Sequence, residues 1–511
     1  MKIKSKTTNL IIMWGAVLFL LTYHLSHWPT TWYDEGINLQ VPKNLVMFGK
    51  YGIQSSEGVR LFDPLVSTGP TVLLPIALSF KLFGIGLVQA RTVMVIFAML
   101  ALISVYVLTT HIFDVKTAFV ALLLILPIPY FSDDVSASFL GLSRMALGEV
   151  PNLFFVIMGC LLYFKASDQN SLSLLLGAGV FFGLSIITKE QSLLIVPALI
   201  LFWIIDRLWY HRIHLNQVLI LLGSTLAIFV IWSLSRNYLT GTSYAEQNSG
   251  QIIVQAMAGF TSPSHVIHNI RVLLGSGTLI WGLPGLVYGV YLCAERSLNG
   301  FKRAFLFCLC IVWLAWFLIG SIGWLRYAFL GICLMQLFTA KLFVDLAIGS
   351  TLLLGAPNNS GGIYWITKER FQRLAIIALL TLLTITPLQQ KTKEILLGSN
   401  NSPIEFAGYI RENIGPETVV ESFEPEIVFL ADNNFHQPSL SILMKTVRHV
   451  NFGEPYTLDM LELDKVRPEY LILGPFSKWT GIYANEIGSG KYTSVTTIGE
   501  YDLYKAIDQS E

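Results

Sequence analysis

Two carboxylates stand just after the first long apolar segment of the chain. Asp34 and Glu35 follow a segment that ends near His24. A carboxylate there could act as a general base that takes a proton from an acceptor hydroxyl or amine, which is worth about 10²–10⁴-fold in rate. The simpler interpretation is structural, with Asp34 as the cap of the next helix and Glu35 in its first turn, where the backbone favours anions. The two roles are compatible, and the spacing alone does not choose between them.

The segment after these carboxylates has the pattern of an amphipathic helix. Its apolar residues recur at helical spacing, namely Ile37, Val41, Leu45 and Phe48. We expect one face of this helix to lie on a membrane, with Trp32 and Tyr33 as interface anchors and Gly49 as the C-terminal cap.

The composition of the chain indicates that these residues belong to an integral membrane protein. Of 511 residues, 53% are hydrophobic and only 13% are charged, and the mean hydropathy is +0.60. A soluble domain carries about 25% charged residues, and a soluble chain this apolar would aggregate through its exposed patches. A net charge of +1 and the lack of a long basic run argue against disorder and against a nucleic-acid partner.

Eleven apolar segments are candidates to cross the membrane as helices. They centre on 8–25, 91–111, 115–131, 151–165, 172–188, 190–206, 215–235, 276–294, 304–322, 325–347 and 373–389. A twelfth segment, 69–87, contains Pro70, Pro75 and Lys81. If it does not cross, most basic loop residues fall on the side of Lys2, Lys4 and Lys6, as the positive-inside rule requires. We therefore predict that 69–87 is interfacial or re-entrant, that the N-terminus is cytoplasmic, and that residues 391–511 lie outside.

This topology gathers most carboxylates of the membrane part on the outer face. They are Asp34, Glu35, Glu57, Asp63, Asp133, Asp134, Glu149, Glu190 and Glu246. A few cations lie on the same face against the general rule, namely Arg144, Lys189, Arg271 and Arg326. One explanation is an anionic ligand at this face. The other is that these cations snorkel or pair with the carboxylates.

Residues 391–511 differ in character from the membrane part, 1–390. They hold 18 acidic and 10 basic residues. The pattern predicts an α/β domain with helices at 404–414 and 424–430, strands at 418–422 and 470–473, and a hairpin from 492 to 504. Such a domain could help to select an acceptor or could only cover the outer face.

At this point the sequence resembles the GT-C glycosyltransferases, which include protein O-mannosyltransferases and the aminoarabinose transferase of lipid A. The resemblance begins with Asp34-Glu35 and the loop 26–90, whose helix ends in Gly49-Lys50-Tyr51-Gly52. Further motifs follow in the family's order across residues 8–345. They are Ser67-Thr68-Gly69-Pro70-Thr71 with Leu82-Phe83-Gly84 and Arg91, then Arg144 to Pro151 around Glu149, Thr188-Lys189-Glu190, and Arg326-Tyr327.

The resemblance implies a polytopic α-helical GT-C fold with an extracytoplasmic α/β domain, and an inverting sugar transfer from a polyprenyl-phosphate donor. By position, Asp34 would be the base and Glu35 would orient Asp34 or the substrate. Glu149 would contact the sugar or the acceptor. Lys189, Arg326 and Arg144 would neutralise the departing lipid phosphate, with Tyr327 beside them, because fixed cations stabilise developing charge.

The chain departs from the lipid A transferases late in the first loop. Where they carry Lys-Pro, this sequence reads Phe62-Asp63-Pro64. The departure suggests that Arg60 or Lys189 serves the phosphate instead. Asp63 is either a substrate-facing acid or a turn residue before Pro64.

The acceptor is not specified by the sequence and could be a lipid, a glycan or a protein. No cofactor motif is present, and dependence on a divalent metal stays open. The resemblance implies an enzyme of the plasma membrane. The rival hypothesis is a transporter or flippase of lipid-linked sugars, although transporters usually hold charged groups within their spans. A third hypothesis is an enzyme that joins lipid-linked oligosaccharides.

Overall fold

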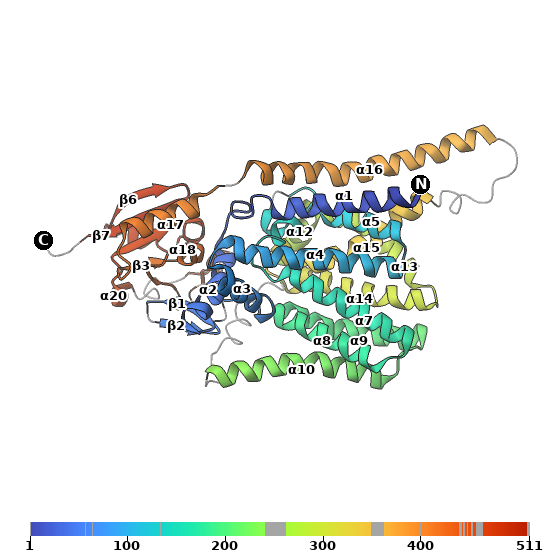
Figure 1. The fold of residues 1–511 in the computed structure, drawn as a ribbon, viewed down its shortest axis with the longest axis horizontal. Coiled ribbons are helices and arrows are strands. Elements are labelled where there is room, and N and C mark those ends of the chain that lie inside the picture. The colour runs from blue at the N-terminus through green and yellow to red at the C-terminus, as the bar shows by residue number, and fades with distance from the viewer. Residues whose placement is uncertain are drawn as a thin grey trace.

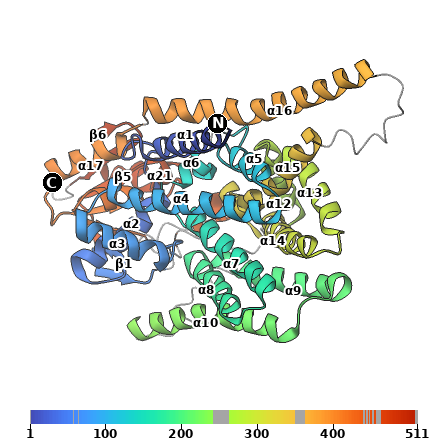
Figure 2. The ribbon, with the colours of Figure 1, turned by 45° about the vertical axis from the view of Figure 1, so that its right-hand side comes forward.

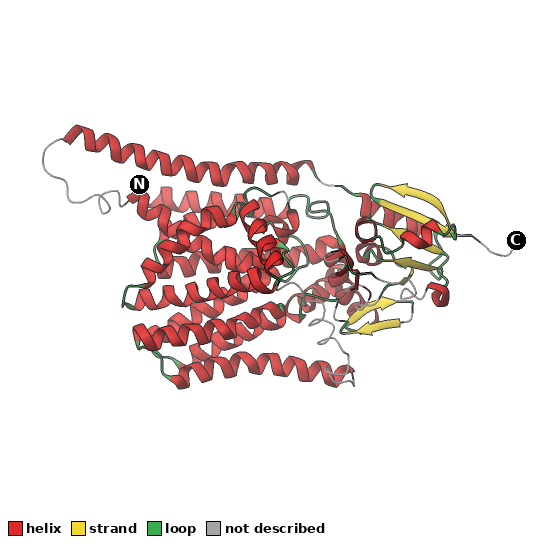
Figure 3. Ribbon diagram, turned by 180° about the vertical axis from the view of Figure 1, so that it is seen from behind, coloured by secondary structure: helices red, strands yellow, loops and turns green. Residues whose placement is uncertain are grey.

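The protein consists of a helical bundle with a small sheet domain at one end (Figures 1 and 3). The computed structural model describes residues 2–56, 58–63, 65–132, 134–240, 262–348, 362–398, 400–438, 442, 445–446, 448–450, 453–455 and 463–507. Glu57, Asp133 and Glu246, expected on the outer face, and Pro64 lie outside these residues.

Most helices of the bundle are apolar and lie roughly side by side (Figures 1 and 2). The helices and the short helical turns of the bundle are, in chain order, α1 (Lys2–Thr22), α4 (Leu87–Ile112), α5 (Val115–Ile125), α7 (Glu149–Gln169), α8 (Leu172–Thr188), η2 (Glu190–Leu194), α9 (Ile195–Ile205), η3 (Asp206–Tyr210), α10 (Leu215–Thr240), α12 (Pro263–Gly275), α13 (Thr278–Cys293), α14 (Leu298–Gly320), η4 (Leu325–Ala328), α15 (Phe329–Ile348) and α16 (Gly362–Leu397). Short turns η1 (Val135–Ala137) and α6 (Phe139–Leu142) precede α7.

Each of the eleven predicted spans coincides with helical structure. Within the described residues, seven helices are long and apolar enough to cross a membrane, or up to eight if α12 and α13 form one span. That pair is bent by 93°, at Gly277, whose φ of 73° suits glycine. The other three predicted spans are shorter apolar helices: α5, α8 and the segment Ile12–Thr22 of α1. The protein is therefore a multi-pass membrane protein.

The doubtful segment 69–87 forms α3 (Pro70–Phe83), a helix of 14 residues. At 1.5 Å per residue it is too short for a hydrocarbon core of about 30 Å. It packs against α2 (Tyr33–Phe48) and α4 at the end of the bundle that faces the sheet domain (Figure 1).

The helix α2 corrects the expectation of an amphipathic helix lying on the membrane. It ends at Gly49 as expected, with φ of 67°, but it is buried on nearly all sides from Tyr33 to Asn44. It packs against α3, against the hairpin β1 (Gly52–Ser55) and β2 (Gly58–Leu61), and against α18 (Pro425–Leu430) of the sheet domain. Tyr33 stacks on Phe476 of that domain with ring centroids 4.0 Å apart, so it is not a membrane anchor.

The sheet domain has five strands in the order β4-β3-β5-β7-β6. Its remaining elements are α17 (Ser402–Asn413), β3 (Val419–Ser422), β4 (Asn434–His436), α20 (Leu463–Val466), β5 (Tyr470–Leu473), α21 (Pro475–Thr480), α22 (Ala484–Gly488), β6 (Tyr492–Ile498) and β7 (Tyr501–Ala506). Strand β3 pairs in parallel with β4 and β5, whereas β7 is antiparallel to both β5 and β6. All five elements predicted for this region are present. α16 runs beyond residue 390 to Leu397 before α17 begins.

Candidate active site

A cavity of about 1480 Å³ lies between the end of the bundle and the sheet domain. Its walls come from the start of α2, the loop before α3, the α8–η2 junction, α10, η4 and the sheet domain. Of the predicted site residues, Asp34, Asp63, Lys189, Arg326 and Tyr327 line this cavity. Glu35, Arg60, Arg144 and Glu149 are not among its lining residues.

Asp34 forms an ion pair with Arg326 across the cavity wall, through its Oδ2 and Nη1 of the arginine. The side chain of Asp34 is 18% exposed, against 5% for Arg326. Three aromatic rings surround the guanidinium, at 4.9 Å for Trp32, 4.8 Å for Trp324 and 5.3 Å for Tyr327. Such rings hold a guanidinium by cation–π attraction. The cation is thereby fixed at the cavity with its Nε buried and without a hydrogen-bond partner among the described residues.

Lys189 forms a second ion pair, with Glu149 at the start of α7. Both side chains are less than 10% exposed. Nζ of Lys189 lies 5.3 Å from the centroid of the Tyr327 ring, the same distance as the guanidinium carbon of Arg326. Two cations of the cavity thus approach one tyrosine ring, and each is paired with a carboxylate.

The interpretation of Asp34 as a helix cap is wrong. Trp32 is the N-cap of α2, no side chain caps this helix, and Asp34 lies within its first turn. Its carboxylate turns to Arg326 instead.

Glu35 lies away from the cavity and is fully buried with Arg91 of α4. Its carboxylate receives Nε and Nη2 of Arg91 at 2.9 and 2.6 Å, and the N–H of Ala146 at 3.2 Å. Arg91 also donates to the carbonyl of Leu25 at 2.9 Å. Glu35 therefore joins α2, α4 and the loop before α7 through buried hydrogen bonds.

The glycine-proline motif of the first loop holds that loop against Lys189. Gly69 donates its N–H to the carbonyl of Thr188 at 2.9 Å, and a Cβ on Gly69 would lie 1.6 Å from the carbonyl oxygen of Ile187. The hydroxyls of Thr71 and Thr188 are 2.6 Å apart. Only glycine permits this contact, which explains why two motifs far apart in sequence meet beside the cavity.

Arg144 does not reach the cavity, so its predicted contact with a lipid phosphate is not supported. Its guanidinium donates to the carbonyls of Leu20, at 2.8 Å, and Tyr23, at 2.5 Å, and it lies 5.1 Å from the ring of Trp28. It satisfies carbonyls that the end of α1 leaves without helical partners.

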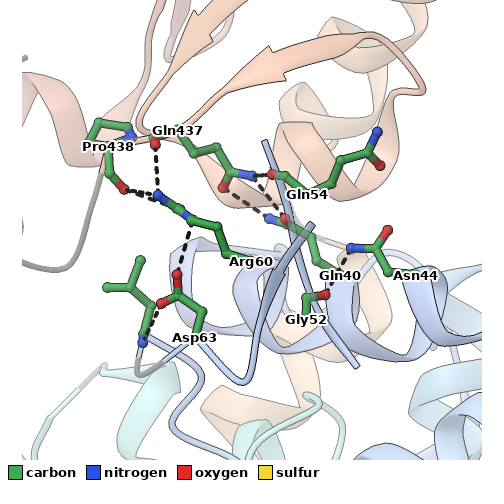
Figure 4. Close-up of polar contacts among 9 residues, drawn as sticks. Gln40, Asn44, Gly52, Gln54, Arg60, Asp63, Gln437 and Pro438 are labelled. Carbon is green, nitrogen blue, oxygen red and sulfur yellow. Dashed lines mark hydrogen bonds and ion pairs between the residues drawn. The ribbon is translucent and has the colours of Figure 1, made fainter. Parts of the chain in front are cut away.

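Arg60 is also committed to structural contacts (Figure 4). It donates to the carbonyls of Gln437 and Pro438 at 3.2 to 3.5 Å and pairs with Asp63 at 3.1 Å. Asp63 accepts the N–H of Leu65 at 2.9 Å, as a turn acid does. Burial raises the pKa of Asp63, with Arg60 and the N–H of Leu65 opposing that shift.

Polar side chains of the first loop form hydrogen bonds and an ion pair with the sheet domain. Gln40 and Gln437 exchange side-chain hydrogen bonds at 2.9 and 3.2 Å, and Gln437 also donates to the carbonyl of Gln54 (Figure 4). Lys43 donates to the carbonyl of Phe429 at 2.9 Å and pairs with Asp432 at 2.8 Å. These bonds hold the sheet domain over the cavity.

The sequence motifs did not identify the sheet-domain side of the cavity or its wall on α10. The sheet domain contributes Glu424, Glu426, Phe476, Trp479, Glu500 and Tyr501, and α10 contributes Phe229, Trp232, Ser233 and Arg236. One signal for the first group was available, because Glu424 and Glu426 follow the carboxyl end of a predicted strand, a common place for binding residues in parallel sheets. Within the described residues, no group of three or more His, Cys, Asp or Glu side chains is arranged to hold a metal ion.

Comparisons with known proteins agree with this architecture. Residues 67–235 match the family model described as dolichyl-phosphate-mannose-protein mannosyltransferase. No curated protein matches the chain by sequence. Among solved structures, ArnT from Cupriavidus metallidurans bound to undecaprenyl phosphate is 13% identical, with a TM-score of 0.62 over 99% of each chain. The archaeal oligosaccharyltransferase AglB from Archaeoglobus fulgidus, in complex with an inhibitory peptide and a dolichol-phosphate, is 15% identical, with a TM-score of 0.57 over 99% of this chain and 75% of that chain. The predicted resemblance to GT-C glycosyltransferases is confirmed.

Proposed function

We propose that this glycosyltransferase moves one sugar from a polyprenyl-phosphate carrier to an acceptor hydroxyl or amine, with inversion at the anomeric carbon and Asp34 as the general base. The observation that carries the proposal is the meeting of Asp34, Lys189 and Arg326 in one cavity. A base and two cations are what this reaction requires, because a proton leaves the acceptor while negative charge develops on the departing lipid phosphate.

The Asp34–Arg326 pair is a resting arrangement that the donor would rearrange. A phosphate competes for the guanidinium of Arg326, whose Nε is buried and without a hydrogen-bond partner among the described residues. When the phosphate binds Arg326 and Lys189, Asp34 loses part of its ion pair and becomes a better proton acceptor. Donor binding would therefore activate the base.

The transfer is a single displacement at the anomeric carbon of the donor sugar. The acceptor O–H or N–H gives its proton to Asp34, and the acceptor oxygen or nitrogen forms a bond to the anomeric carbon. The bond from that carbon to the phosphate oxygen breaks, and its electron pair leaves with the lipid phosphate beside Lys189 and Arg326. Attack opposite the leaving group inverts the anomeric centre.

A lipid-linked donor is supported by the wall of the cavity on α10. Phe229, Trp232 and Ser233 line it from a helix with the composition of a membrane span. A polyprenyl tail could therefore stay among membrane helices while its headgroup enters the cavity. The ligands named for the ArnT and AglB structures, undecaprenyl phosphate and a dolichol-phosphate, have this chemistry.

The base is tested with membranes that contain a polyprenyl-phospho-sugar labelled in its sugar. Asp34→Asn should lower transfer to the endogenous acceptor by about 10²–10⁴-fold while the donor still binds. Glu412→Gln, which changes an exposed carboxylate on α17, is the matched control and should transfer normally. Unchanged transfer by Asp34→Asn would mean that Asp34 is not the base.

The same preparation separates the enzyme from the transporter hypothesis. A flippase would move labelled lipid across sealed vesicles with its sugar–phosphate bond intact, whereas the enzyme releases unglycosylated lipid phosphate. The enzyme is favoured because the ion pairs of the cavity lie at the end of the bundle beside the sheet domain, rather than halfway along the spans.

We further propose that the cavity and the sheet domain lie outside the plasma membrane and the N-terminus inside. The described cysteines lie in membrane helices, so single cysteines can be added as reporters. With an impermeant maleimide on intact cells, Glu412→Cys in the sheet domain should react and Lys116→Cys in the exposed first turn of α5 should not. The reverse labelling would invert the topology.

A further inference from the structure

The sheet domain presents two carboxyl groups to the cavity that the transfer chemistry does not use. Glu424 and Glu426 flank Pro425 at the start of α18, and both line the cavity although each is only 1% exposed. Carboxyl groups are rarely buried so deeply unless they are paired. The hydrogen bonds that each of the two carboxyl groups accepts differ.

The carboxylate of Glu424 accepts hydrogen bonds from donors of its own domain on both of its oxygens. Its Oε1 accepts from the N–H of Gly474 at 3.1 Å and from the N–H and hydroxyl of Ser477, both at 2.8 Å. Its Oε2 accepts from the N–H of Phe476 at 3.3 Å. These donors belong to the first turn of α21, so Glu424 fastens that helix and its aromatic residues to α18.

For Glu426, a hydrogen-bond donor reaches only one of the two carboxyl oxygens among the described residues. Its Oε1 accepts from the hydroxyl of Tyr501 at 2.7 Å. Its Oε2 is buried, and among the described residues its polar neighbour is the carboxyl of Glu424, which can bond it only through a shared proton. A buried polar atom without a partner costs about 1–3 kcal/mol. Because Glu426 lines the cavity, a hydroxyl of a bound ligand can complete its hydrogen bonding.

The charge state of Glu426 narrows the chemistry of that ligand. Burial, and then the negative charge of Glu424, raise the pKa of Glu426 well above its ordinary value. A carboxyl that favours its protonated form can donate a hydrogen bond as well as accept one. The lipid phosphate is better served by the fixed cations Lys189 and Arg326 on the other walls of the cavity.

An aromatic surface lines the same cavity as this carboxyl group. Trp479 lines the cavity with 50% of its surface exposed and packs edge-on against Phe476 at 5.5 Å. Phe476 in turn stacks on Tyr33, the residue before Asp34. A flat apolar face and a hydrogen-bonding carboxyl in one cavity suit a sugar ring, which has an apolar face and a rim of hydroxyls.

We propose that Glu426, with Tyr501 and Trp479, forms a saccharide subsite in which Oε2 of the carboxyl binds a sugar hydroxyl and the indole packs on the ring. The subsite rests on the proposed function, since it places a sugar next to Asp34. The saccharide could be the sugar of the donor or a sugar of the acceptor, and the two sources predict different measurements.

The main test compares the binding of undecaprenyl phosphate with that of undecaprenyl-phosphate-mannose to the full-length protein. Glu426→Met keeps side-chain size but removes both carboxyl oxygens. If the subsite holds the donor sugar, this variant should bind the mannosylated lipid about 10-fold more weakly and the bare lipid phosphate equally well. If it holds an acceptor sugar, both lipids should bind normally, and the KM for the acceptor should rise by a similar factor.

Two further variants separate this role from a structural one. Glu426→Met leaves the hydroxyl of Tyr501 unpaired, so the double variant E426M/Y501F should recover stability without recovering the lost sugar binding. Glu426→Gln can still hydrogen-bond a hydroxyl and should restore most of it.

An equal effect of Glu426→Met on both lipids, with an unchanged acceptor KM, would overturn the subsite. So would full recovery of sugar binding in the double variant. If the wild type bound neither lipid, the proposed function would fail and the subsite with it, which is a distinct result. Glu412→Gln is the matched control of charge in the same domain.

Discussion

Gly36 of the first loop touches the backbone of Glu426 in the sheet domain. A Cβ built on Gly36 would lie 2.2 Å from the backbone nitrogen of Glu426 and 2.5 Å from its Cα. The helix that carries Asp34 and the helix that carries Glu426 therefore pack with no side chain between them. This contact fixes the distance between the proposed base and the proposed saccharide subsite.

Gly36→Ala should separate α2 from α18. Backbone atoms cannot yield as a flexible side chain would, so the overpacking should cost about 1–3 kcal/mol and lower both Tm and transfer. Thermal unfolding and the labelled-donor assay measure the two effects. Gly223→Ala is the matched control, because a Cβ there meets nothing within 4 Å in α10. A wild-type Tm in Gly36→Ala would argue against this close packing.

Glu35→Gln should act on stability more than on chemistry. Arg91 is 0% exposed and would keep its charge without a full partner, which typically costs about 3–5 kcal/mol. The expected result is a large fall in Tm and yield, with the folded fraction retaining more activity than Asp34→Asn. The double variant E35L/R91M should regain stability, since it leaves no unpaired buried charge. If Glu35→Gln lost as much activity as Asp34→Asn at unchanged Tm, Glu35 would take part in the transfer step itself.

The motifs expected on one face meet one another in the structure, although their individual pairings were not predicted. Glu35 pairs with Arg91, Gly69 with Thr188, and Lys189 with Glu149. The helices and strands were predictable, since apolar periodicity and length decide them locally. The type and order of the elements thus follow from residue type and order, which a sequence displays directly.

Side-chain direction was not predictable in the same way. Asp34 stands where a cap is expected, but the start of α2 is shifted and the carboxylate turns to Arg326. Arg144 has the charge of a phosphate ligand, yet the end of α1 takes up its donors. The sheet-domain wall of the cavity was missed because nothing in the sequence indicates that α18 packs on α2. Such outcomes depend on tertiary packing, which local patterns do not encode.

Lys189→Met should lower both stability and transfer. It leaves Glu149 buried and unpaired, at a cost of about 3–5 kcal/mol, and it removes a cation from the phosphate position. Adding Glu149→Gln should recover much of the stability but not the transfer, since Lys189 lines the cavity and Glu149 does not. Tm and transfer rates of the two single variants and the double variant form the measurement. Recovery of transfer in the double variant would show that Lys189 serves packing alone.

The stability of the protein should fall as pH rises, through Glu426. Its pKa in the folded protein is raised well above the ordinary value of 4.5, by burial first and then by Glu424. Above that ordinary value the unfolded chain releases the proton while the folded protein retains it, so the unfolded state binds fewer protons and unfolding becomes more favourable with rising pH. Glu426→Gln carries no proton to lose. The Tm of Glu426→Gln minus that of the wild type should therefore increase as pH is raised from about 5 to about 8. Glu412→Gln is the charge control. A Tm difference that stays constant across this range would contradict the assignment, because a structural effect of the substitution alone does not vary with pH.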